Sequence, residues 1–111
     1  MKTSNSSINI NSLHGRVKEL GKKEVVLDVR SREEYMDGHV PGSINIPRDE
    51  VARYAAKLKS YDRIYVHCQA GKRAQLAFAD LEKQGLTNLV CVTGGGMADW
   101  IEAGYEIDKG A

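Results

Sequence analysis

The chain has 111 residues, a formal net charge of +1 and 28% charged residues. This length is typical of one domain with a single hydrophobic core, and the mixed charges give no reason to expect a nucleic acid or a membrane surface as a partner. Residues 1–10 are polar and lack the apolar run of a signal peptide or a membrane span, so we expect a cytoplasmic protein.

The N-terminal third alternates apolar runs with a helical pattern. Residues 8–10 predict a short first strand, and Ser12 is placed to cap a helix that Gly21 ends. The apolar side chains of this helix are Leu13, Val17 and Leu20. Residues 25–29 are apolar and rich in β-branched side chains, which is typical of a strand buried on both faces.

The middle of the chain predicts a short strand between two helices. Ser31 and Glu34 have the spacing of a capping box, so a short helix should begin there and end by Gly38. Residues 43–46 predict a brief strand closed by a proline, and a second helix should begin at residue 48 or 49. The expected core face of this second helix is formed by Val51, Tyr54, Ala55 and Leu58.

The C-terminal part repeats the alternation of strand and helix. Residues 63–67 predict a strand, and residues 73–84 predict a helix that Gly85 ends. Residues 89–92 predict the last strand and residues 97–103 the last helix. The side chains expected to face the core from these two helices are Ala74, Leu76, Ala77, Phe78, Leu81, Trp100 and Ile101.

Strands that alternate with helices predict an α/β fold with about five strands in a mostly parallel sheet, helices on both faces and right-handed crossovers. We expect the domain to span residues 8–107, between a flexible N-terminal tail of residues 1–7 and a C-terminal tail of residues 108–111. Ligands of such sheets bind at the carboxyl ends of the strands.

The segment at residues 64–73 predicts an anion pocket around a nucleophile. An apolar strand leads into Cys68, and a short loop then opens a helix, whose first N–H groups have no partner in a preceding turn. These free donors and the helix dipole favour a thiolate. Gly71 permits a tightly curled loop. The residues expected to bind the anion are Gln69, Ala70, Gly71, Lys72 and Arg73.

The alternative for a lone cysteine is a small, buried, inert side chain. The position of Cys68 between a strand end and a Gly-Lys-Arg helix start argues against a core role. Cys91 lies within an apolar run and is expected to be a packed strand residue, with a resolving role as the minor alternative. No CxxC pair or Cys/His spacing suggests a disulfide or zinc, so we expect a reducing compartment and no metal.

Three motifs in this order resemble those of the rhodanese family of sulfurtransferases. The segment Cys-Gln-Ala-Gly-Lys-Arg at residues 68–73 is similar to the family's C-x-x-G-x-R active loop. Residues 27–47, from Leu-Asp-Val-Arg to Ser-Ile-Asn-Ile-Pro, resemble its upstream motif, and Gly-Gly-Gly-Met-Ala-Asp-Trp at residues 94–100 resembles its C-terminal one. The resemblance extends roughly from Ile8 to Tyr105.

The resemblance implies a single-domain thiosulfate sulfurtransferase that works without a cofactor. A donor such as thiosulfate would leave a persulfide on Cys68, and a thiol, cyanide or a protein would accept the sulfur. Lys72 would attract the anionic donor if it lines the mouth of the pocket, whereas Arg73 either does the same or turns inward as a brace. The resemblance also implies supporting roles for Asp28, Arg30 and Glu34.

Other polar and glycine positions are expected to be structural. Strand alternation points His67 away from the direction of Cys68, and we expect His14 and His39 in turns or on the surface. The glycines at residues 94–96 lack P-loop spacing, so they predict a turn that lets the last helix pack closely rather than a phosphate cradle.

Rival functions differ in the chemistry of the loop. Cysteine-based phosphatases and arsenate reductases share a similar segment with a C-x5-R loop, whereas four residues separate Cys68 from Arg73 here. We expect this shorter loop to suit a persulfide sulfur and to be too small for phosphate, and no acidic residue is convincing as a general acid. A persulfide carrier or a non-catalytic interaction module with little turnover remains the alternative.

Overall fold

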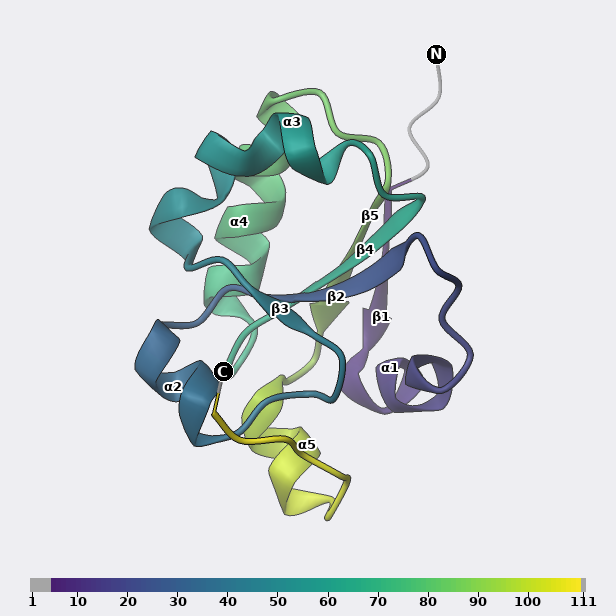
Figure 1. Ribbon diagram of the computed structural model, residues 1–111, viewed down its shortest axis with the longest axis vertical. Helices are drawn as coiled ribbons and strands as arrows, with labels where there is room; N and C mark the ends of the chain where they lie inside the picture. The colour runs from purple at the N-terminus through teal and green to yellow at the C-terminus, as the bar shows by residue number, and fades with distance from the viewer. Residues whose placement is uncertain (1–4, 111) are drawn as a thin grey trace.

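The computed structural model describes residues 5–110 and has one sheet with helices on both of its faces (Figure 1). The strands are β1 (Ser6–Asn9), β2 (Glu24–Asp28), β3 (Ile44–Asn45), β4 (Arg63–His67) and β5 (Leu89–Thr93). The helices are α1 (Ile10–Val17), α2 (Arg32–Asp37), the 3₁₀ helix η1 (Arg48–Tyr54), α3 (Ala55–Leu58), α4 (Lys72–Lys83) and α5 (Met97–Glu102).

The strands form a parallel sheet in the order β1-β5-β4-β2-β3. The register places Asp28 of β2 opposite Asn45 of β3 on one side and His67 of β4 on the other. These three residues therefore form one row across the sheet, at the carboxyl ends of their strands. The predicted five-stranded α/β fold is confirmed.

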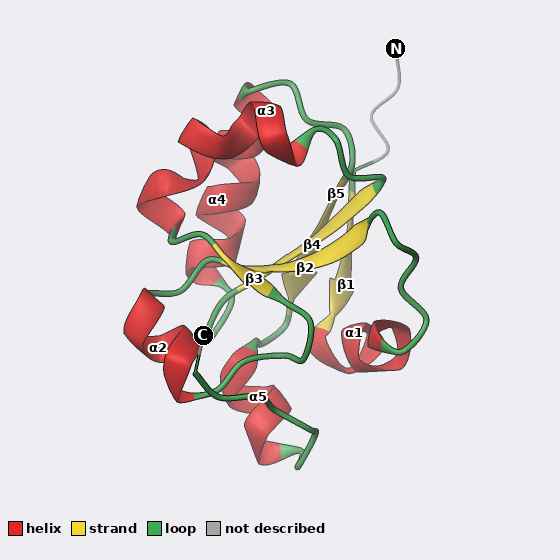
Figure 2. Ribbon diagram, viewed as in Figure 1, coloured by secondary structure: helices red, strands yellow, loops and turns green. Residues whose placement is uncertain are grey.

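Alternating side chains of the sheet contribute to two separate cores, as a pleated strand requires. One core joins Leu27 and Val66 of the sheet to the helices η1, α3 and α4. The other joins Val26 and Tyr65 to Leu13 of α1 and Trp100 of α5. Figure 2 shows these two groups of helices on opposite faces of the strands. Because both faces are covered, the middle residues of the central strands β2 and β4 are buried and mostly apolar.

Local sequence signals located several element ends correctly. Ser31 and Glu34 form the predicted capping box at the start of α2, and Gly38 is its C-cap. The strand predicted at residues 63–67 has the observed bounds of β4, and α4 ends at the C-cap Gln84, directly before Gly85 with its φ of +89°. Signals carried by caps and glycines therefore gave the ends of α2 and α4 to within about one residue.

The first strand and the first helix both begin earlier than predicted. Strand β1 starts at Ser6, and Asn9 rather than Ser12 is the N-cap of α1, since the Asn9 side chain accepts a hydrogen bond of 2.8 Å from the Ser12 N–H. The chain passes directly from strand to helix there. Gly21 does not end α1, whose C-cap is Lys18.

Three side chains predicted to face the core are exposed instead: Tyr54 (36%), Leu76 (42%) and Ile101 (48%). Neighbouring helix positions differ by about 100°, so Trp100 and Ala77 occupy the buried direction and leave Ile101 and Leu76 toward solvent. Tyr54 ends a 3₁₀ helix rather than an α-helix, which changes the direction of its side chain.

The C-terminal segment folds back over the second core. His39 and Asp108 form an antiparallel bridge, and the Trp100 indole donates a 2.8 Å hydrogen bond to the Glu106 carbonyl. The division into a domain and two tails remains a prediction, and residues 1–4 and 111 lie outside the described residues. No helix within residues 5–110 is long and apolar enough to cross a membrane.

Candidate active site

Cys68 lies directly after β4, where the active loop turns into α4. Its sulfur accepts hydrogen bonds from two backbone N–H groups, that of Gly71 at 3.1 Å and that of Ala74 at 3.2 Å. The residue is only 1% exposed. Two N–H donors at the start of a 12-residue helix stabilise negative charge on the sulfur. The arrangement therefore suits a thiolate.

Glycine makes the curl of the loop possible. Gly71 is the N-cap of α4 and has a φ of +116°, a backbone conformation that L side chains rarely adopt. This conformation brings its N–H back toward the sulfur of Cys68. The sequence predicted this need at Gly71. It did not reveal the Ala74 donor, because a backbone N–H leaves no mark on residue identity.

The glycine turn before α5 lets that helix pack against the active loop. A Cβ on Gly96 would lie 2.2 Å from the Cys68 carbonyl oxygen, so no side chain fits there. The N–H groups of Met97 and Ala98 donate to the carbonyls of Cys68 and Gln69, at 2.8 and 3.2 Å. The predicted close packing is confirmed. Helix α5 thus binds carbonyl groups of the loop, whereas N–H groups of the loop and of α4 point toward the sulfur.

Arg73 joins the active loop to α2. Its guanidinium donates to both carboxylate oxygens of Glu34, at 2.6 and 2.9 Å. This hydrogen bonding is the main reason that the pKa of Glu34 is lowered to about 2. The sequence left the orientation of Arg73 open, and the structure places it in a brace between two helices, with both side chains more than a third exposed.

Asp28 and Arg30 form a second, buried ion pair next to the loop. The Arg30 Nε lies 3.0 Å from each Asp28 carboxylate oxygen, and both residues are at most 3% exposed. Arg30 also donates to Gln69 at 3.2 Å and to the Gly38 carbonyl at 2.7 Å. One guanidinium thus connects β2, the end of α2 and the loop that follows Cys68.

Asn45 belongs to the same network, a role that was not predicted from the sequence. Its side-chain amide donates to the carbonyls of Asp28 and Arg30, at 2.9 and 3.0 Å. The signal in the sequence is a polar residue between two isoleucines of a short strand. Only the sheet register shows that it lies beside Asp28.

Lys72 differs from the other two basic residues beside the loop. Arg30 is paired with Asp28 and Arg73 with Glu34, whereas Lys72 is exposed and forms no ion pair with any residue that the structure describes. Its charge is therefore free to act on an approaching anion.

The hydrogen bonds to the Cys68 sulfur come from backbone N–H groups, and the histidines and Cys91 are not among the donors. His67 is fully buried, with Nε2 3.8 Å from Asp28, and burial lowers its pKa, which favours the neutral ring. The prediction of a turn or surface position is wrong for His39, which is 5% exposed and stacks on Tyr35. His14 lies in α1 rather than in a turn and is partly exposed. Cys91 is packed in β5 as predicted, and burial raises its pKa to about 11.

A comparison with protein families finds a match that spans most of the chain. A family model described as Rhodanese-like domain matches residues 13–103. The putative sulfur carrier protein YrkF of Bacillus subtilis is 41% identical over 75 residues, which cover 68% of this chain and 40% of that protein. The protein HIGH ARSENIC CONTENT 1, mitochondrial, of Arabidopsis thaliana is 34% identical over 95 residues, covering 75% and 56%. The chain therefore spans about half the length of these relatives.

Solved structures show the same fold. A rhodanese-related protein from Thermoplasma volcanium is 36% identical with a TM-score of 0.75, and the match covers 93% of this chain and 97% of that one. The thiosulfate sulfurtransferase from Pseudomonas aeruginosa is 25% identical with a TM-score of 0.81, covering 96% of this chain and 21% of that one.

Proposed function

Because this chain belongs to the family of rhodanese-like domains, we propose that it transfers sulfane sulfur through a persulfide on Cys68. Names of its relatives, among them a sulfur carrier protein and a thiosulfate sulfurtransferase, support sulfur transfer as the general activity. The observation that carries the proposal is the position of the Cys68 sulfur, which accepts two N–H hydrogen bonds at the start of α4.

In the first step the Cys68 thiolate attacks the outer sulfur of thiosulfate. A new S–S bond forms as the S–S bond of the donor breaks, and sulfite leaves with the electron pair. In the second step cyanide or a thiolate attacks the outer sulfur of the persulfide, and Cys68 leaves as a thiolate. The products are thiocyanate or a persulfide on the acceptor, and no further oxidant or reductant is needed.

The loop's N–H groups stabilise the charge that Cys68 carries before and after each turnover. Donors of this kind elsewhere contribute about 2.7 to 4 kcal/mol each to barrier lowering. Lys72 attracts the doubly charged donor. The ion pairs of Arg30 with Asp28 and of Arg73 with Glu34 hold the loop in place, so these residues act as positioning residues.

The hydrogen bonds of Arg73 argue against the alternative of a phosphatase or arsenate reductase. Its guanidinium is occupied by both oxygens of Glu34, so it is not free to hold a phosphate. The loop is also one residue shorter than C-x5-R. A persulfide carrier uses the same residues as the enzyme and differs only in turnover.

An activity assay separates these functions. We expect the reduced protein to form thiocyanate from thiosulfate and cyanide over many turnovers, Cys68→Ala to form none, and Cys91→Ala to keep most of the activity. A single turnover by the wild type would favour the carrier. Hydrolysis of p-nitrophenyl phosphate that Cys68→Ala abolishes would overturn the proposal.

A further inference from the structure

The outer edge of β3 lies between two hollows of the surface. β3 is the last strand of the sheet, so no strand within residues 5–110 pairs with the outer side of its backbone. The first hollow has a volume of about 260 Å³ and is bounded by η1 and α3. The second, of about 370 Å³, is bounded by α2. Both are lined by the same three residues, Arg32, Ile44 and Asn45. We call the two hollows and the strand edge between them the β3 groove.

The two hollows lie where the side chains of an added strand would point. Successive side chains of a strand point to opposite faces of its sheet. A segment paired with β3 would therefore direct one side chain toward Tyr54 and Tyr61 and the next toward Tyr35 and Met36. A two-residue edge strand is too short to hold a partner through backbone hydrogen bonds alone. Side chains of the partner would therefore have to bind in the two hollows, which would also make the binding selective.

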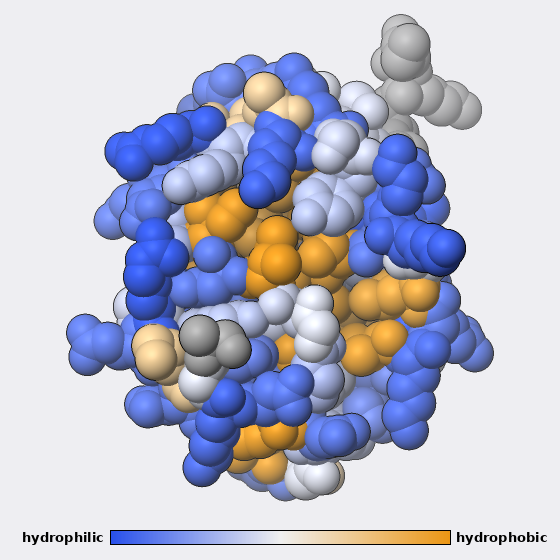
Figure 3. All heavy atoms as spheres, viewed as in Figure 1, coloured by the Kyte–Doolittle hydropathy of each residue, from blue (hydrophilic) through white to orange (hydrophobic). Residues whose placement is uncertain are grey.

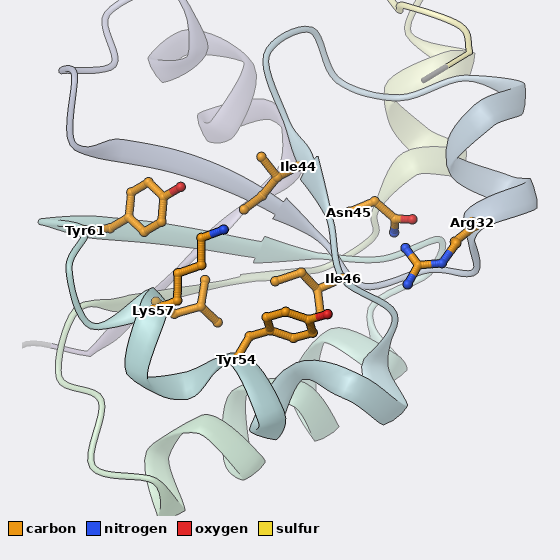
Figure 4. Close-up of a pocket in the computed structure, with 8 residues that line it drawn as sticks. Arg32, Ile44, Asn45, Ile46, Tyr54, Lys57 and Tyr61 are labelled. Atoms are coloured by element: carbon orange, nitrogen blue, oxygen red, sulfur yellow. The ribbon is translucent and has the colours of Figure 1, made fainter.

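Most of the side chains that line the groove are apolar or aromatic. Ile44, Ile46 and Leu58 line the first hollow together with the rings of Tyr54 and Tyr61, which come from different segments (Figure 4). Met36, which lines the second hollow, is 51% exposed. Apolar side chains gather on the face of the molecule over β3, and hydrophilic residues surround them (Figure 3).

The charges that line the groove are positive. Lys57 and Arg32 lie on either side of Ile46 in Figure 4. Within residues 5–110 Lys57 forms no ion pair, and Arg32 contacts Glu50 through a single nitrogen while 61% exposed. None of the described residues that line the two hollows is acidic. A second copy of this chain that docked through the same groove would place cations against cations, so an acidic partner fits better.

We infer that the β3 groove binds an extended segment of a partner protein in which apolar side chains alternate with acidic ones, by adding that segment to the edge of the sheet. The groove lies close to the active site. Asn45 and His67 are two strands apart in one row, which corresponds to roughly 10 Å. The inference does not depend on the proposed sulfur chemistry.

Selection from a phage-displayed library of linear heptapeptides on the immobilised full chain tests the inference. We expect the recovered peptides to be enriched in Asp or Glu beside β-branched and aromatic residues. Fluorescence anisotropy of a recovered peptide should show a loss of affinity of at least tenfold with Lys57→Glu. The matched control is Lys59→Glu, which reverses an exposed charge directly after α3 and should change affinity less than twofold.

Backbone pairing has its own signature. Methylation of the peptide nitrogens that face β3 should abolish binding, whereas methylation of the alternate nitrogens should not. Recovery of no peptides or of peptides without acidic enrichment, equal effects of the two lysine variants, or indifference to N-methylation would overturn the inference. Dimerisation of the free chain that Lys57→Glu changes would assign the groove to a second copy and would also overturn it.

Discussion

At the scale of single residues, the charges around Cys68 divide into those that hold the loop and one that is free. Arg30 forms an ion pair with Asp28, and Arg73 forms one with Glu34. Their side chains connect the loop to β2 and α2, and their positive charges are largely neutralised. We therefore expect the attraction for the proposed anionic donor to depend on Lys72 and on the N–H groups of the loop.

Glu34→Gln should weaken the brace to Arg73 in a pH-dependent way. The folded-state pKa of Glu34, about 2, is below the ordinary value of 4.5. Its charge therefore stabilises the fold above about pH 4.5, and this contribution is lost as the pH falls toward 2. Because the pair is partly exposed, we expect a loss below about 1 kcal/mol at pH 7.

Urea unfolding of the wild type and of Glu34→Gln at pH 7, 5, 4 and 3 measures this effect. The difference between the two proteins should be constant from pH 7 to 5 and should shrink between pH 4 and 3. Glu33→Gln is the control, because Glu33 lies on the same helix and forms no ion pair with any residue in the range 5–110. A difference that grows on acidification would show that the assigned direction of the pKa shift is wrong.

The site could be predicted from the sequence where chemistry resides in a side chain. Cys68, Gly71 and Arg73 follow from their spacing, and the side chains of Asp28 and Glu34 lie where the motifs suggested. Asn45 could not be found this way, because its role depends on a register between strands that are not adjacent in sequence. The Ala74 donor was missed because any residue at that position offers the same N–H.

At the scale of elements, the contact between α5 and the active loop is the tightest constraint on the site. Two N–H groups of α5 hold two loop carbonyls, and Gly96 permits the approach. Caps and glycines predicted most element ends because they act locally. The 3₁₀ geometry of η1 and the outward direction of Ile101 were missed because packing against the rest of the fold decides them.

Gly96→Ala should separate α5 from the loop. The added Cβ would meet backbone oxygen rather than a flexible side chain, so the helix or the loop must move. We expect a loss of stability of about 1 to 3 kcal/mol and a fall in sulfurtransferase kcat/KM of at least about tenfold. Thermal unfolding and the thiocyanate assay measure the two effects.

Gly15→Ala is the matched control for this substitution. Gly15 lies within α1, and nothing lies within 4 Å of the position of an added Cβ. Alanine should therefore stabilise the protein by about 0.5 to 1 kcal/mol and leave activity unchanged. If Gly96→Ala behaved like Gly15→Ala, the close contact would not matter for the site.

At the scale of the whole molecule, a net charge of +1 provides little long-range attraction for an anion. For the doubly charged donor that we propose, the attraction must therefore come from charge close to the loop. The strand order of the sheet places these charges near the loop. Strands β4 and β2 are neighbours, so the loop after β4 and the ion pairs after β2 lie together at the carboxyl ends of the two strands. The fold was predictable for a related reason: regular alternation of strands and helices permits few arrangements.

Lys72→Ala should reduce both the rate of persulfide formation and its dependence on salt. We expect kcat/KM for thiosulfate to fall by about three- to tenfold at low ionic strength and by less at 0.5 M NaCl, where exposed charges are screened. Stopped-flow measurements over a salt series, with Lys59→Ala as the control, provide the comparison. Equal salt dependence in the wild type and Lys72→Ala would place the attraction elsewhere.

The most direct test of persulfide chemistry is the intact mass of the reduced protein after incubation with thiosulfate and removal of excess donor. The proposal predicts a gain of one sulfur atom in the wild type and in Cys91→Ala, reversed by cyanide and absent in Cys68→Ala. A gain that persists in Cys68→Ala, or no gain in any of the three proteins, would contradict a persulfide formed on Cys68 from this donor.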